Sequence, residues 1–212
     1  AALIPSAEVL NADLVRLHPI LRDARDQLVA AKDMWLKVTT GRTESLPNLK
    51  RTLDAVHADA KEVGNPALRK LTGSLVKRLE KMPLSGNVSE PLAMEYATAM
   101  LLAENAVDKF GNLSSEFPKQ VDAMLARLDA AQAGRAIPAA TAPILDEMFR
   151  RAHERLLLTQ VAREIQANLR RMEQVLDAFF RDHTKRAELA TLSKDSQQIL
   201  GALKMVGEDN AD

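Results

Sequence analysis

The sequence predicts an all-α protein, built as an antiparallel helical bundle with one long helix in its C-terminal part. Hydrophobic residues make up 46% of the 212 residues, while aromatic residues account for only 3%. Ala and Leu, which dominate the apolar set, lose little conformational freedom in a helix, whereas the β-branched and aromatic residues that favour strands are sparse. Apolar residues also recur at spacings of three and four, which is the period of one helix face.

The N-terminal half contains a series of helical patterns, each with its own start and stop signals. The first begins at Ser6 and bends or restarts at His18-Pro19, because proline lacks an amide hydrogen and crowds the preceding turn. Further helices are predicted near residues 20–38, 45–63, 66–79, 89–110 and 115–133. Short loops containing Gly, Asn, Ser or Pro join them, which is typical of a helical bundle.

Three regions follow from this pattern. Residues 1–134 form a helical bundle, residues 135–143 form an Ala- and Pro-rich linker, and residues 144–212 hold a long helix and the start of a second module that is cut short. No Gly or Pro interrupts residues 144–182, and about 40 residues at about 1.5 Å each give a rod of roughly 60 Å. A shorter helical pattern covers 185–206. Because the sequence ends just after this pattern, we expect it to be a piece of a longer protein.

Apolar residues of the long helix alternate at spacings of four and three, which is the pattern of a seam between helices. They are Leu158, Ala162, Ile165, Leu169, Met172, Leu176 and Phe179. The pattern favours a stripe that packs within this chain. The alternative is a homodimer formed through Leu158, Ile165, Leu169, Met172, Leu176 and Phe179.

The composition excludes several classes of function. Lys plus Arg and Asp plus Glu both number 29, so the formal charge is zero and a dedicated nucleic-acid binder is not expected. No run of about 20 apolar residues could cross a bilayer, so no membrane insertion is expected. The absence of cysteine excludes disulfides and thiolate chemistry and fits a reducing compartment. We therefore expect a soluble, cytoplasmic protein.

The sequence contains no motif of an enzyme active site. The four histidines, His18, His57, His153 and His183, form no metal-binding spacing, and His153-Glu154 lacks the second His of an H-E-x-x-H motif. No Gly-rich phosphate loop and no G-x-S-x-G elbow occurs. Acidic and basic residues interleave along the long helix, which indicates ion pairs at i,i+4 spacing. We therefore expect no catalytic site, no metal and no cofactor.

Four stretches of the sequence carry a family resemblance. They are Glu95–Ala106, Glu154–Leu169, Glu173–Asp182 and Lys194–Gly207. Together they resemble the N-terminal histidine-phosphotransfer-like (Hpt-like) region of CheA-type hybrid sensor histidine kinases of the chemosensory type IV pilus system. The resemblance implies a cytoplasmic module of two-component signalling and chemotaxis, whose partners are a receiver or regulator domain and other kinase domains. In such a module a histidine on a helical bundle attacks the aspartyl phosphate of a receiver.

The chain departs from the H-x-x-K-G motif of that family at both positions where it could lie. A weak internal echo, Lys61-x-Val-Gly64 and Lys204-x-Val-Gly207, aligns the two positions. In the first, Asp54 occupies the histidine slot, His57 the lysine slot and Ala58 the glycine slot. In the second, Gln197 occupies the histidine slot, Leu200 the lysine slot, and only Gly201 fits. Neither Asp54 nor Gln197 can form a phosphoimidazole, so both modules are interpreted as degenerate.

The resulting hypothesis is a non-phosphorylatable, phosphotransfer-like scaffold that docks signalling proteins in a phosphorelay. One alternative is a helical dimerisation or spacer module that uses the seam of the long helix. Another is an active phosphotransfer domain that uses His57 as phosphoacceptor, with Lys61 one turn further along the same helix. The plain alternative for His57 is a surface residue without a special role, because a reactive group needs a base, a partner or a shaped site.

Overall fold

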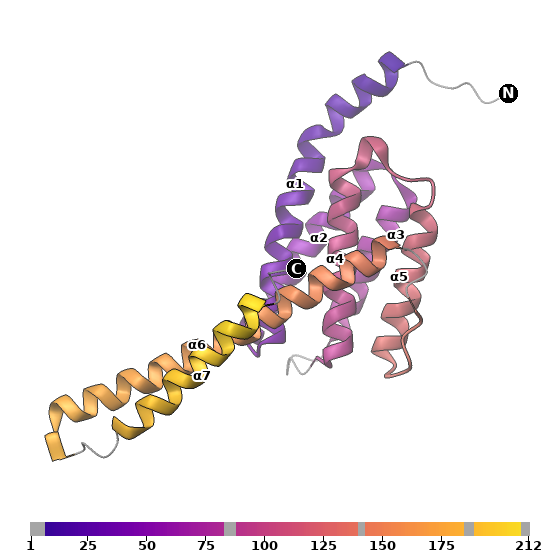
Figure 1. Cartoon of the computed structure of the whole chain (residues 1–212). Helices are drawn as coiled ribbons and strands as arrows, with labels where there is room; N and C mark the ends of the chain where they lie inside the picture. The colour runs from indigo at the N-terminus through magenta and orange to yellow at the C-terminus, as the bar shows by residue number, and fades with distance from the viewer. Residues whose placement is uncertain (1–6, 83–87, 140–142, 185–188, 209–212) are drawn as a thin grey trace. The chain divides into compact units, whose positions relative to one another are not determined.

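The computed structural model describes residues 7–82, 88–139, 143–184 and 189–208. Within these ranges the chain forms seven α-helices and no strand, which confirms the predicted all-α fold (Figure 1). The helices are α1 (Ala7–Thr39), α2 (Leu46–Val63), α3 (Pro66–Glu80), α4 (Glu90–Asp108), α5 (Phe117–Gln132), α6 (Pro143–Arg181) and α7 (Ala190–Glu208). Short 3-10 turns, η1 (Thr43–Ser45) and η2 (Phe110–Asn112), precede α2 and follow α4.

The chain divides into two compact units, Ala1–His153 and Glu154–Asp212. The boundary lies inside α6, whereas the predicted end of the first bundle lies before the linker at 135–143. The first turns of α6 account for the difference, because Leu145, Met148 and Ala152 are buried and Leu145 belongs to the core of the first unit. A helix without an internal break thus contributes to both units.

The first unit is a bundle of five helices with the start of α6. Helix α2 packs against α1 and α3, α4 packs against α1, α3 and α5, and α3 packs against α5 (Figure 1). Two aromatic residues join these helices at the centre of the core. The Trp35 indole donates a hydrogen bond of 3.0 Å to the carbonyl of Ala93, and the Tyr96 hydroxyl donates one of 2.6 Å to the carbonyl of Leu75. The two rings lie 4.4 Å apart, so α1, α3 and α4 share one packed centre.

The turn between α2 and α3 follows the expected sequence signals. Gly64 ends α2 with a positive φ of 80°, a backbone conformation that a side chain disfavours. The Asn65 side chain then accepts a hydrogen bond of 3.0 Å from the backbone amide of Leu68, and Pro66 occupies the first turn of α3. These two positions set the antiparallel arrangement of α2 and α3, on which the groove described below depends.

Helix α1 corrects the prediction of a break at His18-Pro19. The helix runs through Pro19 without interruption. Proline removes the hydrogen bond to the carbonyl four residues earlier, at Val15. Val15 is 73% exposed and Pro19 is also exposed, so water can satisfy that carbonyl and the helix continues.

Two ion pairs of the bundle are largely buried on both sides. Arg127 of α5 donates two hydrogen bonds, of 2.8 and 2.6 Å, to the fully buried Glu95 of α4. It also donates one of 2.8 Å to the carbonyl of Pro138, and its guanidinium lies 5.5 Å from the centre of the Phe149 ring. Lys32 of α1 pairs with Glu104 of α4. Because each of these four charges has a partner, the two pairs link α4 to α5 and α1, and Arg127 also holds the 135–139 segment against the bundle.

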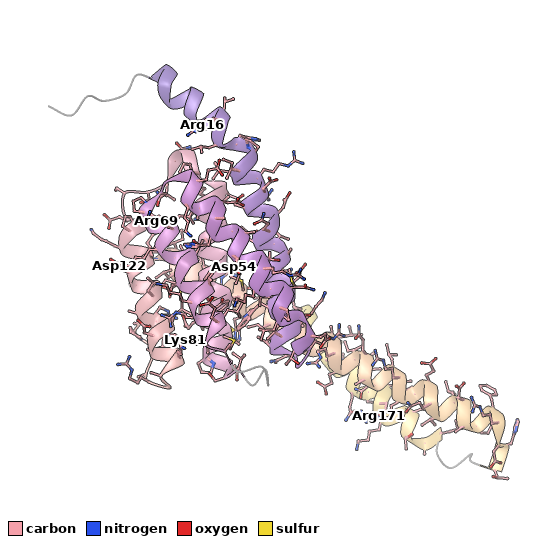
Figure 2. The ribbon with its side chains drawn as sticks, turned by 180° about the vertical axis from the view of Figure 1, so that it is seen from behind. Arg16, Asp54, Arg69, Lys81, Asp122 and Arg171 are labelled. Atoms are coloured by element: carbon pink, nitrogen blue, oxygen red, sulfur yellow. The ribbon has the colours of Figure 1, made fainter. Side chains whose placement is uncertain are left out.

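The second unit consists of the remainder of α6 and of α7, which run side by side in Figures 1 and 2. Arg171 of α6 lies 3.6 Å from the carboxylate of Asp195 on α7, and Asn168 and Asp195 are buried. The predicted seam is only partly covered: Ile165, Met172 and Phe179 are half-buried, as the burial pattern of α6 shows. Its other large residues, Leu158, Leu169 and Leu176, are 44%, 51% and 38% exposed.

The internal echo Lys-x-Val-Gly does not mark equivalent helix ends. Gly64 ends α2, but α7 extends past Gly207 to Glu208. Residues 185–188, where the last helical pattern was predicted to begin, lie outside the described residues. Among the helices that the structure describes, none combines the length and the apolar character needed to cross a membrane.

Candidate functional site: a basic groove around His57

A groove with a volume of about 740 Å³ lies over the outer face of α3. Figure 2 places Arg69 toward one end of α3 and Lys81 just beyond the other, with Asp54 on α2 and Asp122 nearby. The groove is lined by His57 of α2, by Leu125, Asp129 and Gln132 of α5, and by Pro66, Arg69, Lys70, Gly73, Ser74, Lys77, Arg78 and Lys81 on or directly after α3. Five of these residues are cations, and only Asp129 is acidic.

His57 forms part of the groove wall, and one of its ring nitrogens is already engaged. Its Nδ1 atom lies 2.9 Å from the hydroxyl oxygen of the buried Thr72. That hydroxyl has one hydrogen, and the carbonyls of Leu68, at 3.0 Å, and Arg69, at 3.3 Å, can accept it. With that hydrogen used within α3, we assign the Nδ1–H tautomer to His57, in which the Thr72 oxygen accepts the hydrogen bond from Nδ1–H. In a neutral imidazole this tautomer leaves the lone pair on Nε2.

Gly73 provides the space that the His57 ring occupies. A Cβ atom at this position would lie 2.9 Å from Cε1 and 3.4 Å from Nε2 of His57. Glycine inside a helix is less stable than alanine by roughly 0.5–1 kcal/mol. Gly73 has this lower helix propensity at a position where α3 packs against the imidazole. Gly73 and Thr72 together define the position of the ring.

The surroundings of His57 favour its neutral form. Its pKa is lowered from the ordinary value of 6.5, first by partial burial and then by the charge of Lys61. Arg69 and Lys77 lower the pKa further, and Asp54 opposes the shift. His57 is thus a half-buried imidazole whose neutral form is favoured. Four charged residues of α2 and α3 lie within electrostatic reach of it.

The cations of the groove fall into two groups. Lys70 pairs with Asp122 at 2.6 Å, and Arg78 contacts both Asp129 and Gln132 at 2.5 Å. Arg69, Lys77 and Lys81 have no carboxylate partner within the described ranges of the chain, and all three are exposed. Arg69 and Lys77 lie one turn before and one turn after Gly73 on α3, and Lys81, directly after the helix, continues the same spacing of four. This face therefore presents unneutralised positive charge beside His57.

The structure places the residues singled out from the sequence in different surroundings. His57 lies in the groove and Lys61, one turn away, is exposed and acts on it electrostatically. Asp54 is exposed on α2, one turn before His57. Gln197 is exposed on α7 of the second unit, so the two aligned acceptor positions belong to different units.

The contribution of α3 to the groove was not predicted from the sequence. Thr72, Gly73 and the cations of the groove fit an ordinary helical pattern, but the sequence also contains a signal for the groove. Arg69, Gly73, Lys77 and Lys81 repeat at a spacing of four, which puts three cations and the only glycine of α3 on one face. A glycine within a helix between cations one turn away on either side indicates a surface against which another group packs.

The described residues hold no cluster of His, Asp or Glu that could bind a metal ion. Comparison with family models, with curated proteins and with solved structures gave no match. The fold and the groove thus define the chain as a helical-bundle protein with a basic groove built around a positioned histidine.

Proposed function

We propose that the chain is a phosphotransfer-like docking module of a two-component chemosensory kinase, which binds a receiver or regulator protein without carrying phosphate itself. The observation that supports this proposal is the groove: exposed, unpaired cations lie along α3 beside a half-buried histidine. Arg69 and Lys81 are 12 residues apart, or about 18 Å along a helix, which suits a protein surface better than a small molecule. The resemblance of the sequence to phosphotransfer-like regions supplies the class of partner.

The residue at the aligned acceptor position favours docking over phosphoryl transfer. An acceptor must be a histidine whose free nitrogen attacks the phosphorus atom on the partner, because phosphoryl transfer depends on positioning. His57 lies one turn beyond that position on α2, where it packs against Gly73 with its Nδ1 held by Thr72. The exposed position on α2 that aligns with the family histidine is Asp54, whose carboxylate cannot form a phosphoimidazole.

The test is a phosphotransfer and binding experiment on the full chain. The chain is incubated with a receiver domain phosphorylated with acetyl phosphate, and both complex formation and acid-labile phosphohistidine are measured. We expect a complex that weakens as the salt concentration rises, because exposed charges are screened, and no labelling. Labelling that is lost in His57→Gln would replace the docking role with active transfer, and the absence of any complex would contradict both.

A second candidate function rests on the second unit. The exposed Leu158, Leu169 and Leu176 of α6, together with Leu200 and Leu203 of α7, leave large apolar side chains uncovered on two helices. A second copy of this unit would cover them by completing a four-helix arrangement, which is the dimerisation role. Light scattering on the full chain tests it: Leu169→Ser with Leu176→Ser should convert a dimer to a monomer. Val15→Ser, an exposed apolar residue of the first unit, serves as the matched control.

A further inference from the structure

We propose that the groove around His57 is a binding site for a phosphate group carried by a docked partner protein, and that His57 takes up a proton when the phosphate binds. This inference rests on the docking function proposed above and adds the chemistry of the group that is recognised. Binding is non-covalent, so no bond to phosphorus forms or breaks.

The groove residues around Gly73 bring positive charge and a ring nitrogen to the same part of the groove. Gly73 has no side chain, and residues one turn away on either side, Arg69 and Lys77, are exposed cations without a carboxylate partner in the described ranges. The edge of the His57 ring fills the space beside Gly73, where Cε1 and Nε2 are the atoms that an added Cβ would approach, and His57, Arg69 and Lys77 line the same open groove. Two cationic side chains and one imidazole nitrogen can therefore converge on a single group.

The hydrogen-bond arrangement of His57 prepares it to donate to such a group. Nδ1–H is bonded to Thr72, and Nε2 has no hydrogen-bond partner among the residues that the structure describes. Once Nε2 is protonated, its N–H can donate to an anionic oxygen while the Nδ1 bond is kept. The ring does not have to rotate, so the donor is held in place before the ligand arrives.

The charge balance of the groove explains why a dianion is the favoured ligand. The groups that act on His57 are Lys61 and Asp54 of α2 and Arg69 and Lys77 of α3. From α5 the groove contains Asp129, which is paired with Arg78; Lys70 is paired with Asp122, and Lys81 is unpaired. A phosphorylated side chain carries about −1.5 to −2 charges and three acceptor oxygens. It would offset the cations that disfavour the imidazolium and would thereby favour protonation of His57.

The site chemistry is tested with sulfate, which stays a dianion across the pH range used and so leaves His57 as the titrating group. The full chain is titrated with sodium sulfate between pH 8 and pH 5.5, at constant ionic strength with chloride, while the His57 ring protons are followed by NMR. Sulfate should raise the pH at which His57 titrates, and its affinity should rise as the pH falls, by up to about tenfold per pH unit for one proton. His57→Gln should remove this pH dependence.

Three variants separate the groove from general electrostatics. Arg69→Gln with Lys77→Gln should weaken sulfate binding at least about tenfold, whereas Lys119→Gln, an exposed cation of α5 outside the groove, should bind as the unchanged chain does. The proposal is overturned if sulfate acts no differently from chloride, or if His57→Gln keeps the full pH dependence.

A receiver domain in phosphorylated and unphosphorylated forms tests the source of the phosphate. The phosphorylated form should bind at least about tenfold more tightly, and excess sulfate should compete with it. Equal binding of the two forms, insensitive to sulfate, would overturn this inference and leave the docking function standing. If sulfate binds at His57 but neither form of the receiver binds, two claims are contradicted together. One is that a partner protein carries the phosphate, and the other is the docking function.

Discussion

Arg127 and Arg69 belong to the same helical bundle but have opposite surroundings. Arg127 is 8% exposed, and it contacts the Glu95 carboxylate, the Pro138 carbonyl and the Phe149 ring. Arg69 is exposed on α3 and has no carboxylate partner in the described ranges, as is also true of Lys77. In this bundle a buried cation is held by partners from several elements, whereas the cations beside His57 are exposed without a carboxylate partner in the described ranges.

The largest effect is expected at the buried pair. Arg127→Ala would leave the fully buried Glu95 charged and unpaired, and breaking such a pair costs roughly 3–5 kcal/mol. Urea denaturation, followed by circular dichroism, should show this loss of unfolding free energy. Arg127→Met with Glu95→Gln should restore part of it, because no buried charge remains. A loss below about 1 kcal/mol for Arg127→Ala would show that the pair does not maintain the fold.

A smaller effect is expected where α3 meets His57. Gly73→Ala gains helix propensity but brings its Cβ to 2.9 Å from the imidazole, and overpacking of this kind costs about 1–3 kcal/mol. The single variant should therefore unfold at a lower urea concentration than the unchanged chain.

The same substitution should change sign once the ring is removed. In a His57→Ala background, Gly73→Ala should stabilise the chain by up to about 1 kcal/mol, because only the helix propensity remains. A Gly73→Ala that stabilises both backgrounds equally would contradict the described contact.

The fold was largely predictable from the sequence, because the helices depend on local signals. The spacing of apolar residues, the Gly64 stop and the Asn65 cap predicted α2 and α3 within a few residues. Pro19 was misjudged because its effect depends on whether water reaches one carbonyl, which is a property of the folded chain. The groove was not predicted, because His57, Gly73 and Arg69 come together only when α2 and α3 pack.

The pH dependence of stability should reflect the neutral state of His57. Its pKa is lowered in the folded chain, mainly by burial, so the unfolded chain binds a proton more readily. As far as His57 decides it, the free energy of unfolding should be highest above pH 6.5. It should fall as the pH drops from 6.5 toward the lowered pKa of His57. Thermal unfolding of the unchanged chain and of His57→Gln, from pH 8 to pH 5, should show a shallower decline for the variant.

The smallest effect is expected at Asp59, a partly buried carboxylate of α2. Its Oδ2 atom is buried without a hydrogen-bond partner, and its pKa is raised by burial and by the charges of Asp23 and Glu62. The ionised form therefore destabilises the fold at neutral pH, and this penalty is relieved as the pH falls through the raised pKa. Asp59→Asn should stabilise the chain at pH 7 by less than about 1 kcal/mol, and urea unfolding at pH 7 and pH 4 should show the gain only at pH 7.

Isothermal titration of the phosphorylated receiver domain into an α3 charge-reversal variant tests the central claim most directly. We expect Arg69→Glu with Lys77→Glu to lower the affinity at least about a hundredfold, while the urea midpoint stays close to that of the unchanged chain because neither residue has a folded-state partner in the described ranges. Lys119→Glu should leave the affinity nearly unchanged. An affinity that survives the reversal on α3 would contradict the assignment of this face as the docking surface.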